Sequence, residues 1–168
     1  MITNPLRVCI DISAAVHRRA GLGRYAQELV KGLVDLRRDA ASAPLQLSVF
    51  YHQRGEAILE PPIDQLTRLT TRLSVRPWRL RTALAYFTNI GMDRSFGSAD
   101  VFHATEHLLP RLKRVRSVFT LHDLIFQFDP ASHKPLNIAF LKSIMPKFLK
   151  QADAIIAVSE STKRDAIR

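Results

Sequence analysis

Two acid–histidine pairs in this sequence could bind a polar substrate or move protons. Glu106 directly precedes His107, and His122 directly precedes Asp123. An imidazole titrates near neutral pH, and a carboxylate can orient it or bind sugar hydroxyls. His122 could therefore contact a substrate or accept a proton, while Asp123 fixes its orientation or simply caps the next turn. Because adjacent side chains seldom point the same way, we do not expect His122 and Asp123 to form a dyad.

Two further histidines accompany these pairs. His103 lies in an apolar stretch, where a core role is the commoner one, but together with Glu106 it could orient sugar hydroxyls in a cleft. His17 begins a basic run with Arg18 and Arg19, and adjacent arginines suit a phosphate or diphosphate group. A solvated basic loop is the alternative for this run.

A pair of glycines, Gly21 and Gly23, could bring the backbone close to a ligand. A helix that begins there would offer free N–H groups to an anion, and Arg24 follows directly. With Ala26 the pattern also matches a dinucleotide-binding fingerprint. That fingerprint directly follows its strand, whereas eight residues separate Ile12 from Gly21, so nicotinamide chemistry is disfavoured. A flexible surface loop remains the plain alternative.

Other catalytic signatures are missing from the sequence. With one cysteine, Cys9, and six scattered histidines, we expect neither a disulfide framework nor a metal site. The nucleophile elbow Gly-x-Ser-x-Gly and the phosphate-binding Gly-x-x-x-x-Gly-Lys-Ser/Thr loop do not occur. Cys9 lies within an apolar stretch, which predicts an inert core residue.

Strands and helices that alternate along the chain must position these candidates. Short, apolar and often β-branched stretches predict strands at Leu6–Ile12, Leu45–Tyr51, Asp100–Thr105, Ser117–Leu121 and Asp153–Val158, with a weaker one at Leu73–Val75. Apolar residues at helical spacing predict helices over Gly21–Arg38, Pro77–Phe96, Pro135–Gln151 and Glu160–Arg168, and a helical turn within Pro61–Leu73. Gly97 should stop the second helix, Pro146 should kink or break the third, and Ser159 should cap the fourth.

This alternation predicts an α/β fold, namely a Rossmann-like parallel sheet flanked by helices. In such sheets, ligands bind beyond the carboxyl ends of the strands. The loops after Ile12, Tyr51, Thr105, Leu121 and Val158 should therefore meet at one edge and bring the candidate residues together.

Composition and charge narrow the function classes. The 168 residues are 46% hydrophobic and contain no long apolar run, so we expect one folded domain that does not span a membrane. The N-terminus lacks signal-peptide features, which predicts a cytoplasmic protein. The formal charge is +10, from 25 Lys and Arg against 15 Asp and Glu.

The positive charge is concentrated in acid-free stretches. One of them contains Trp78 among Arg68, Arg72, Arg76, Arg79 and Arg81. Such stretches suit an anionic membrane surface or nucleic acid, and general solubility is the plain alternative. Because no nucleic-acid-binding motif is present, we do not expect a nucleic-acid partner.

Four segments occur in an order that is typical of one enzyme family. They are the strand Arg7–Asp11 followed by Ala20–Leu29, Val101–Ala104 with Leu108–Pro110, Phe119–Leu124, and Ala154–Asp165. Together they span essentially the whole chain and resemble the N-terminal domain of family 4 (group 1) glycosyltransferases.

The resemblance implies a GT-B fold, in which two Rossmann-like domains face each other across a cleft. The N-terminal domain mainly binds the acceptor, the C-terminal domain mainly binds the nucleotide-sugar, and transfer retains the anomeric configuration without an essential metal. By position, His122 with Asp123 would lie at the reaction centre. The resemblance would place on the donor side Gly21, Gly23, Arg24, Ser159 and Glu160. Candidate acceptor contacts would be His17, Arg18, Arg19, His103 and Glu106.

We therefore expect residues 1–168 to be the acceptor-binding domain of a retaining glycosyltransferase. It would act at the inner membrane face and move a hexose such as mannose from a GDP- or UDP-linked sugar to a glycan or polyprenyl-linked acceptor, in bacterial surface polysaccharide or lipopolysaccharide synthesis. The family's Glu-x7-Glu motif belongs to the C-terminal domain, which is absent from the chain, so this polypeptide alone should be inactive. No cofactor beyond the nucleotide-sugar is expected. The alternative is a non-enzymatic basic module that binds a nucleotide, nucleic acid or protein.

Overall fold

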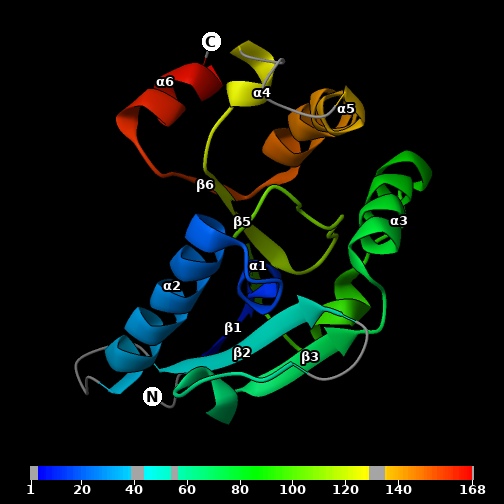
Figure 1. Ribbon diagram of the computed structural model, residues 1–168. Helices are drawn as coiled ribbons and strands as arrows, with labels where there is room; N and C mark the ends of the chain where they lie inside the picture. Colours follow the sequence, from blue (N-terminus) through cyan, green and yellow to red (C-terminus); the bar gives the residue numbers. More distant parts are fainter. Residues whose placement is uncertain (1–3, 39–43, 54–56, 129–134, 168) are drawn as a thin grey trace.

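The computed structural model describes residues 4–38, 44–53, 57–128 and 135–167. Its centre is a sheet of parallel strands in the order β3-β2-β1-β4-β5-β6 (Figure 1). These strands are β1 (Leu6–Asp11), β2 (Leu45–His52), β3 (Thr67–Thr71), β4 (Val101–Ala104), β5 (Arg116–Leu121) and β6 (Ala154–Ala157). The connecting α-helices are α1 (Ser13–Val16), α2 (Ala20–Arg38), α3 (Val75–Thr88), α4 (Ile125–Phe128), α5 (Pro135–Gln151) and α6 (Glu160–Ile167), with 3-10 turns η1 (Ile63–Gln65) and η2 (Asp93–Phe96). The predicted Rossmann-like α/β fold is confirmed.

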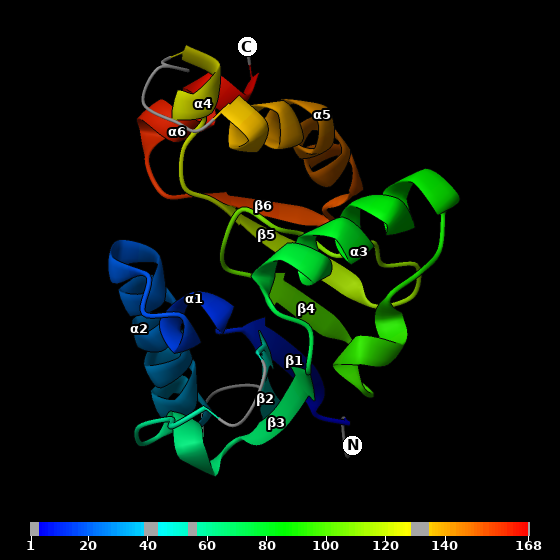
Figure 2. The ribbon, with the colours of Figure 1, turned by 45° about the vertical axis from the view of Figure 1, so that its right-hand side comes forward.

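Two apolar clusters attach the helices to the two faces of the sheet. On one face, Ile10 of β1 packs in a cluster with Val30 of α2. On the other face, Phe119 of β5 lies against Phe148 of α5, with ring centroids 6.0 Å apart, and Trp78 of α3 is fully buried in the same cluster. Figure 2 shows α2 on one side of the sheet and α3 with α5 on the other. The sheet is therefore the middle layer of a three-layer domain, and its strand ends remain accessible at one edge.

The edge strand β3 was not predicted correctly. The strand expected at Leu73–Val75 does not form, and β3 lies earlier, at Thr67–Thr71. The helical turn expected within Pro61–Leu73 is limited to η1. Most side chains of β3 are exposed, so the strand lacks the apolar run that marks a buried one.

Helix α3 is shorter than the predicted Pro77–Phe96. It ends at Thr88 because Asn89 adopts a left-handed conformation with φ of 55°, which terminates a helix. Gly97, the predicted stop, instead follows the separate turn η2. A left-handed asparagine is a weaker sequence signal than glycine, which explains the error.

The apolar residues whose spacing predicted α3 face outward. Leu80, Leu84 and Phe87 are 60%, 50% and 68% exposed. The side of α3 that packs on the sheet instead carries Trp78 and Ala85. The spacing identified a helix, but the buried side lies elsewhere on its surface.

Two other local predictions have clear outcomes. Helix α5 is not broken at Pro146, because the buried side chains of Met145 and Phe148 hold it on the sheet around that exposed proline. Ser159 Oγ accepts the N–H of Thr162 at 3.1 Å, so the predicted cap of α6 is confirmed.

None of the helices in the described ranges is long and apolar enough to cross a bilayer.

Candidate functional site

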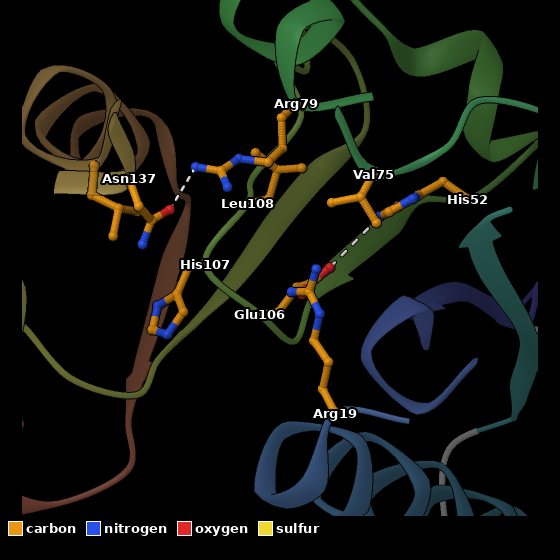
Figure 3. A pocket seen from close by; sticks show the side chains of 9 residues that line it. Arg19, His52, Val75, Arg79, Glu106, His107, Leu108 and Asn137 are labelled. Atoms are coloured by element: carbon orange, nitrogen blue, oxygen red, sulfur yellow. Dashed lines mark hydrogen bonds and ion pairs between the residues drawn. The ribbon is translucent and has the colours of Figure 1, made fainter. Parts of the chain in front are cut away.

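A polar pocket lies where the carboxyl ends of β1, β2 and β4 meet. The chain order of the sheet reverses between β1 and β4, which is where ligands bind in such folds. The cavity measures about 130 Å³ and is lined by Arg19, His52, Val75, Arg79, Glu106, His107, Leu108, Asn137 and Leu141 (Figure 3). Separate loops therefore converge at this edge, as the alternation of strands and helices predicted.

Glu106 is the buried carboxylate of this pocket. Its side chain is 3% exposed, forms an ion pair with Arg19, and places Oε1 3.8 Å from His52 Nε2. Burial alone would raise the pKa of Glu106, but His52 and Arg19 outweigh burial and hold that pKa below its ordinary value. Glu106 is therefore an ionised hydrogen-bond acceptor at neutral pH.

A second carboxylate, Asp11, is buried close to Glu106. Its Oδ1 accepts the backbone N–H of Ser13 at 2.8 Å, and it has no cationic side chain as an ion-pair partner in the described ranges. Burial, and then the charge of Glu106, raise the pKa of Asp11 to about 7. Of the two acids, Asp11 takes the proton because Arg19 and His52 face Glu106 instead.

His52 is held in place by several neighbours. Its backbone N–H donates to Ser13 Oγ at 3.2 Å, and its ring stacks on Trp78 with centroids 5.7 Å apart. His17 Nε2 donates to the backbone oxygen of His52 at 2.8 Å. Burial, and then His52, lower the pKa of His17, which keeps it neutral. His17 supports His52 and does not itself line the pocket.

Arg79 reaches the pocket from α3, on the wall opposite Arg19 (Figure 3). Its guanidinium donates to Asn137 Oδ1 at 2.9 Å and lies 4.2 Å from the ring centroid of Phe140. Burial, and then Arg19, lower the pKa of Arg79, which nevertheless stays a cation. The pocket thus presents two arginines and one ionised carboxylate.

His122 lies beside the pocket but does not line it. Its Nε2 donates to the backbone oxygen of Thr105 at 2.8 Å, and its ring centroid is 5.7 Å from that of His107. Asp123 faces His107, with Oδ2 4.0 Å from Nε2, and its Oδ1 accepts the N–H of Ile125 at 3.2 Å. The expectation that His122 and Asp123 form no dyad is confirmed.

The glycine segment contains a short helix that the sequence did not predict. Between β1 and α2 the chain forms α1, and a Cβ on Gly23 would lie 3.0 Å from Ala14 O. Gly23 is therefore needed for packing. Gly21 has nothing within 4 Å of such a Cβ, and it lies with Arg24 and Arg18 on the exposed surface.

The remaining candidates lie outside the pocket. His103 is 6% exposed, and its Nε2 is hydrogen-bonded to Thr120 Oγ1 at 2.8 Å. Burial lowers the pKa of His103 to about 4, so it is a neutral side chain within the sheet. Ser159 and Glu160 follow β6 at the carboxyl edge but do not line the cavity. In the described ranges, no three acidic, histidine or cysteine side chains form a metal-binding group.

The pocket can bind a ligand that offers both hydroxyl groups and negative charge. Glu106 accepts hydrogen bonds from hydroxyl donors, while Arg19 and Arg79 can pair with anionic oxygens. The fold and this site together define a Rossmann-like domain with a polar binding pocket at the topological switch point.

Comparison with protein families identifies the class more closely. The model of Glycosyltransferase Family 4 matches residues 19–168, which is most of the chain. The chain belongs to glycosyltransferase family 4 and forms a domain of its N-terminal type, so the resemblance found in the sequence motifs is confirmed. Searches of curated proteins and of solved structures gave no significant match.

Sequence reasoning missed three polar side chains that line the pocket. His52 is the last residue of β2, one position beyond the predicted strand end, so its place in the chain was a usable signal. Arg79 was grouped with surface cations, and Asn137 was not considered. Both come from helices on the far wall, and no spacing along the chain links them to Glu106.

Proposed function

We propose that this chain is the acceptor-binding domain of a retaining glycosyltransferase. The enzyme moves a hexose, such as mannose, from a GDP- or UDP-linked sugar to a glycan or polyprenyl-linked acceptor of bacterial surface polysaccharide. Membership of glycosyltransferase family 4 supports sugar transfer as the reaction class. The observation that carries the acceptor role is the ionised Glu106 between Arg19 and His52 in the pocket.

In this proposal, hydroxyl groups of the acceptor donate hydrogen bonds to Glu106. A buried carboxylate held by fixed partners needs little reorganisation when a ligand arrives, which favours one orientation of the sugar. Arg79 and Asn137 approach from the opposite wall and close the site around the acceptor. The transferring hydroxyl then points out of the pocket, toward the donor.

The donor occupies the open side of the same edge. The transferred sugar lies near His122, and the diphosphate approaches the exposed end of α2 at Gly21 and Arg24. A second domain binds the nucleotide and faces the wall formed by Ser159 and Glu160. These assignments come from the family resemblance, and the exposure of Gly21, Arg24, Ser159 and Glu160 is compatible with them.

We also place the domain on the inner face of an anionic membrane. Leu84 and Phe87 are exposed on α3, and Arg76 and Arg81 are exposed on the same helix. Trp78, which the sequence placed among these surface cations, is fully buried and cannot contact lipid. Leu84 and Phe87 therefore supply the apolar part of the membrane contact.

The test is a transfer assay with the full-length enzyme, labelled GDP- and UDP-hexoses, and free or polyprenyl-linked saccharides as acceptors. Glu106→Gln should lower kcat/KM for the acceptor roughly 10- to 100-fold, the value of one charged hydrogen bond, and leave donor KM almost unchanged. His122→Ala should sharply lower kcat. Glu28→Gln, which alters an exposed glutamate paired with Lys31, is the control.

Two results would contradict the proposal. One is the absence of transfer by the wild-type enzyme with every donor and acceptor. The other is a Glu106→Gln enzyme with the same kcat/KM as Glu28→Gln, which would remove the acceptor role from the pocket. Salt-dependent retention on DNA without glycan binding would favour the non-enzymatic module instead.

A further inference from the structure

A long apolar groove runs between α3 and α5 and joins the polar pocket. It measures about 980 Å³ and is lined by Arg76, Arg79, Leu80, Ala83, Pro135, Leu136, Asn137 and Phe140. Arg79 and Asn137 also line the pocket beside Glu106, so the two cavities share a wall. Both ribbon views place α3 and α5 side by side (Figures 1 and 2), and Arg79 bridges them.

The groove is apolar along its length and basic where it meets the pocket. Leu80 and Leu136 are 60% and 87% exposed, which is unusual for two large apolar side chains that flank one cavity. Arg79 is fixed at the junction by Asn137 and Phe140. Among the described residues, none that lines the groove is acidic, and Arg79 forms no ion pair.

Two features make the junction attractive to an anion, namely the guanidinium of Arg79 and the N-terminal ends of two helices. Helices α3 and α5 both begin beside the groove, and neither has an acidic residue in its first turn, so their positive dipole ends favour an anion there.

We propose that this groove holds the hydrocarbon chain of a lipid-linked acceptor whose phosphate group pairs with Arg79. The inference rests on the proposed function and names its acceptor class. The chain would lie along Leu80, Ala83 and Leu136, the phosphate would meet the guanidinium of Arg79, and the saccharide would continue toward Glu106. The order of hydrocarbon, phosphate and sugar in the ligand thus follows the order of groove, arginine and pocket in the protein.

Other occupants fit this arrangement less well. A nucleic acid would use the cations but would leave the apolar walls uncovered. An apolar helix of a partner protein would cover Leu80 and Leu136 but would bring no anion to Arg79. Only an amphiphile with a single anionic end satisfies both parts of the groove.

The experiment measures binding of farnesyl monophosphate to the chain by isothermal titration calorimetry, below the concentration at which the ligand forms micelles. Farnesol and inorganic phosphate are the comparison ligands. Farnesyl monophosphate should bind at least about tenfold more tightly than either, because it alone uses both the apolar walls and Arg79.

Two matched pairs of variants locate the binding. Leu80→Glu and Arg79→Gln should each weaken binding about tenfold or more. Leu36→Glu changes another exposed helical leucine, far from the groove in sequence and absent from its lining. Arg111→Gln changes an arginine that, like Arg79, binds an amide oxygen and lies over an aromatic ring. Both control variants should bind like the wild type.

Several results would overturn the inference. They are undetectable binding, equal affinity for inorganic phosphate or farnesol, equal binding by Leu80→Glu and Leu36→Glu, and displacement of the ligand by an amphipathic peptide at lower concentration than by lipid. Sugar transfer to a lipid-free glycan by an enzyme that does not bind farnesyl monophosphate would reject the groove alone. Binding without any transfer would reject the proposed function alone.

Discussion

The protonation of Asp11 is a sharp test of the electrostatics behind the pocket. Burial, and then Glu106, raise the pKa of Asp11 from 3.8 to about 7. The folded state therefore holds this proton more tightly than the unfolded state does. The resulting stabilisation is complete below the unfolded pKa and is lost as the pH rises through the folded pKa. Above about pH 7, an ionised Asp11 destabilises the fold.

Asp11→Asn removes this ionisation and retains an oxygen that can accept the Ser13 N–H, now bonded at 2.8 Å. A shift from 3.8 to about 7 corresponds to roughly 4 kcal/mol, at about 1.4 kcal/mol per pKa unit. Local relaxation and water entry reduce this upper bound. As the pH rises from 5 to 8, the free energy of unfolding of the variant should increase by about 1–3 kcal/mol relative to that of the wild type.

Urea unfolding followed by circular dichroism at several pH values between 5 and 8 measures this difference directly. Asp100→Asn is the control with the opposite sign, because Arg7 lowers the pKa of Asp100 to about 2 and its carboxylate stabilises the fold above pH 4. A difference between Asp11→Asn and wild type that stays constant with pH would refute the assignment of the proton to Asp11.

Two further predictions concern the glycine segment and the membrane face. Gly23→Ala should lower the free energy of unfolding by about 1–3 kcal/mol, because its Cβ would lie 3.0 Å from a backbone oxygen of α1. Gly21→Ala should leave that energy unchanged or raise it by up to about 1 kcal/mol; equal melting temperatures for the two variants would contradict this packing role. Arg81→Glu should weaken binding to phosphatidylglycerol vesicles about tenfold in a sedimentation assay, whereas Arg94→Glu should not; equal losses would argue against a localised membrane contact.

Prediction from sequence succeeded where the residues of a strand are apolar. This holds for β1, whose inner part is buried, and also for β6, which was predicted as a buried strand but has largely exposed side chains. The inner part of β1 is buried between helices, and its apolar residues therefore predicted a strand there. The edge strand β3 is mostly exposed and left no such pattern. The outward position of Leu80 and Leu84 could not be inferred either, because helical spacing defines a stripe without stating which neighbour it faces.

The sequence by itself determined that parallel strands would gather their loops at one edge, and that Glu106 and His107 would lie there. The physical reason is local: strand and helix patterns specify a parallel sheet, and such a sheet places all its carboxyl ends together. Only the tertiary structure decided that Arg79 shares the pocket, and that Asp11 holds a proton while Glu106 stays ionised. Those outcomes depend on burial and on distances between elements, neither of which is written in the spacing of residues along the chain.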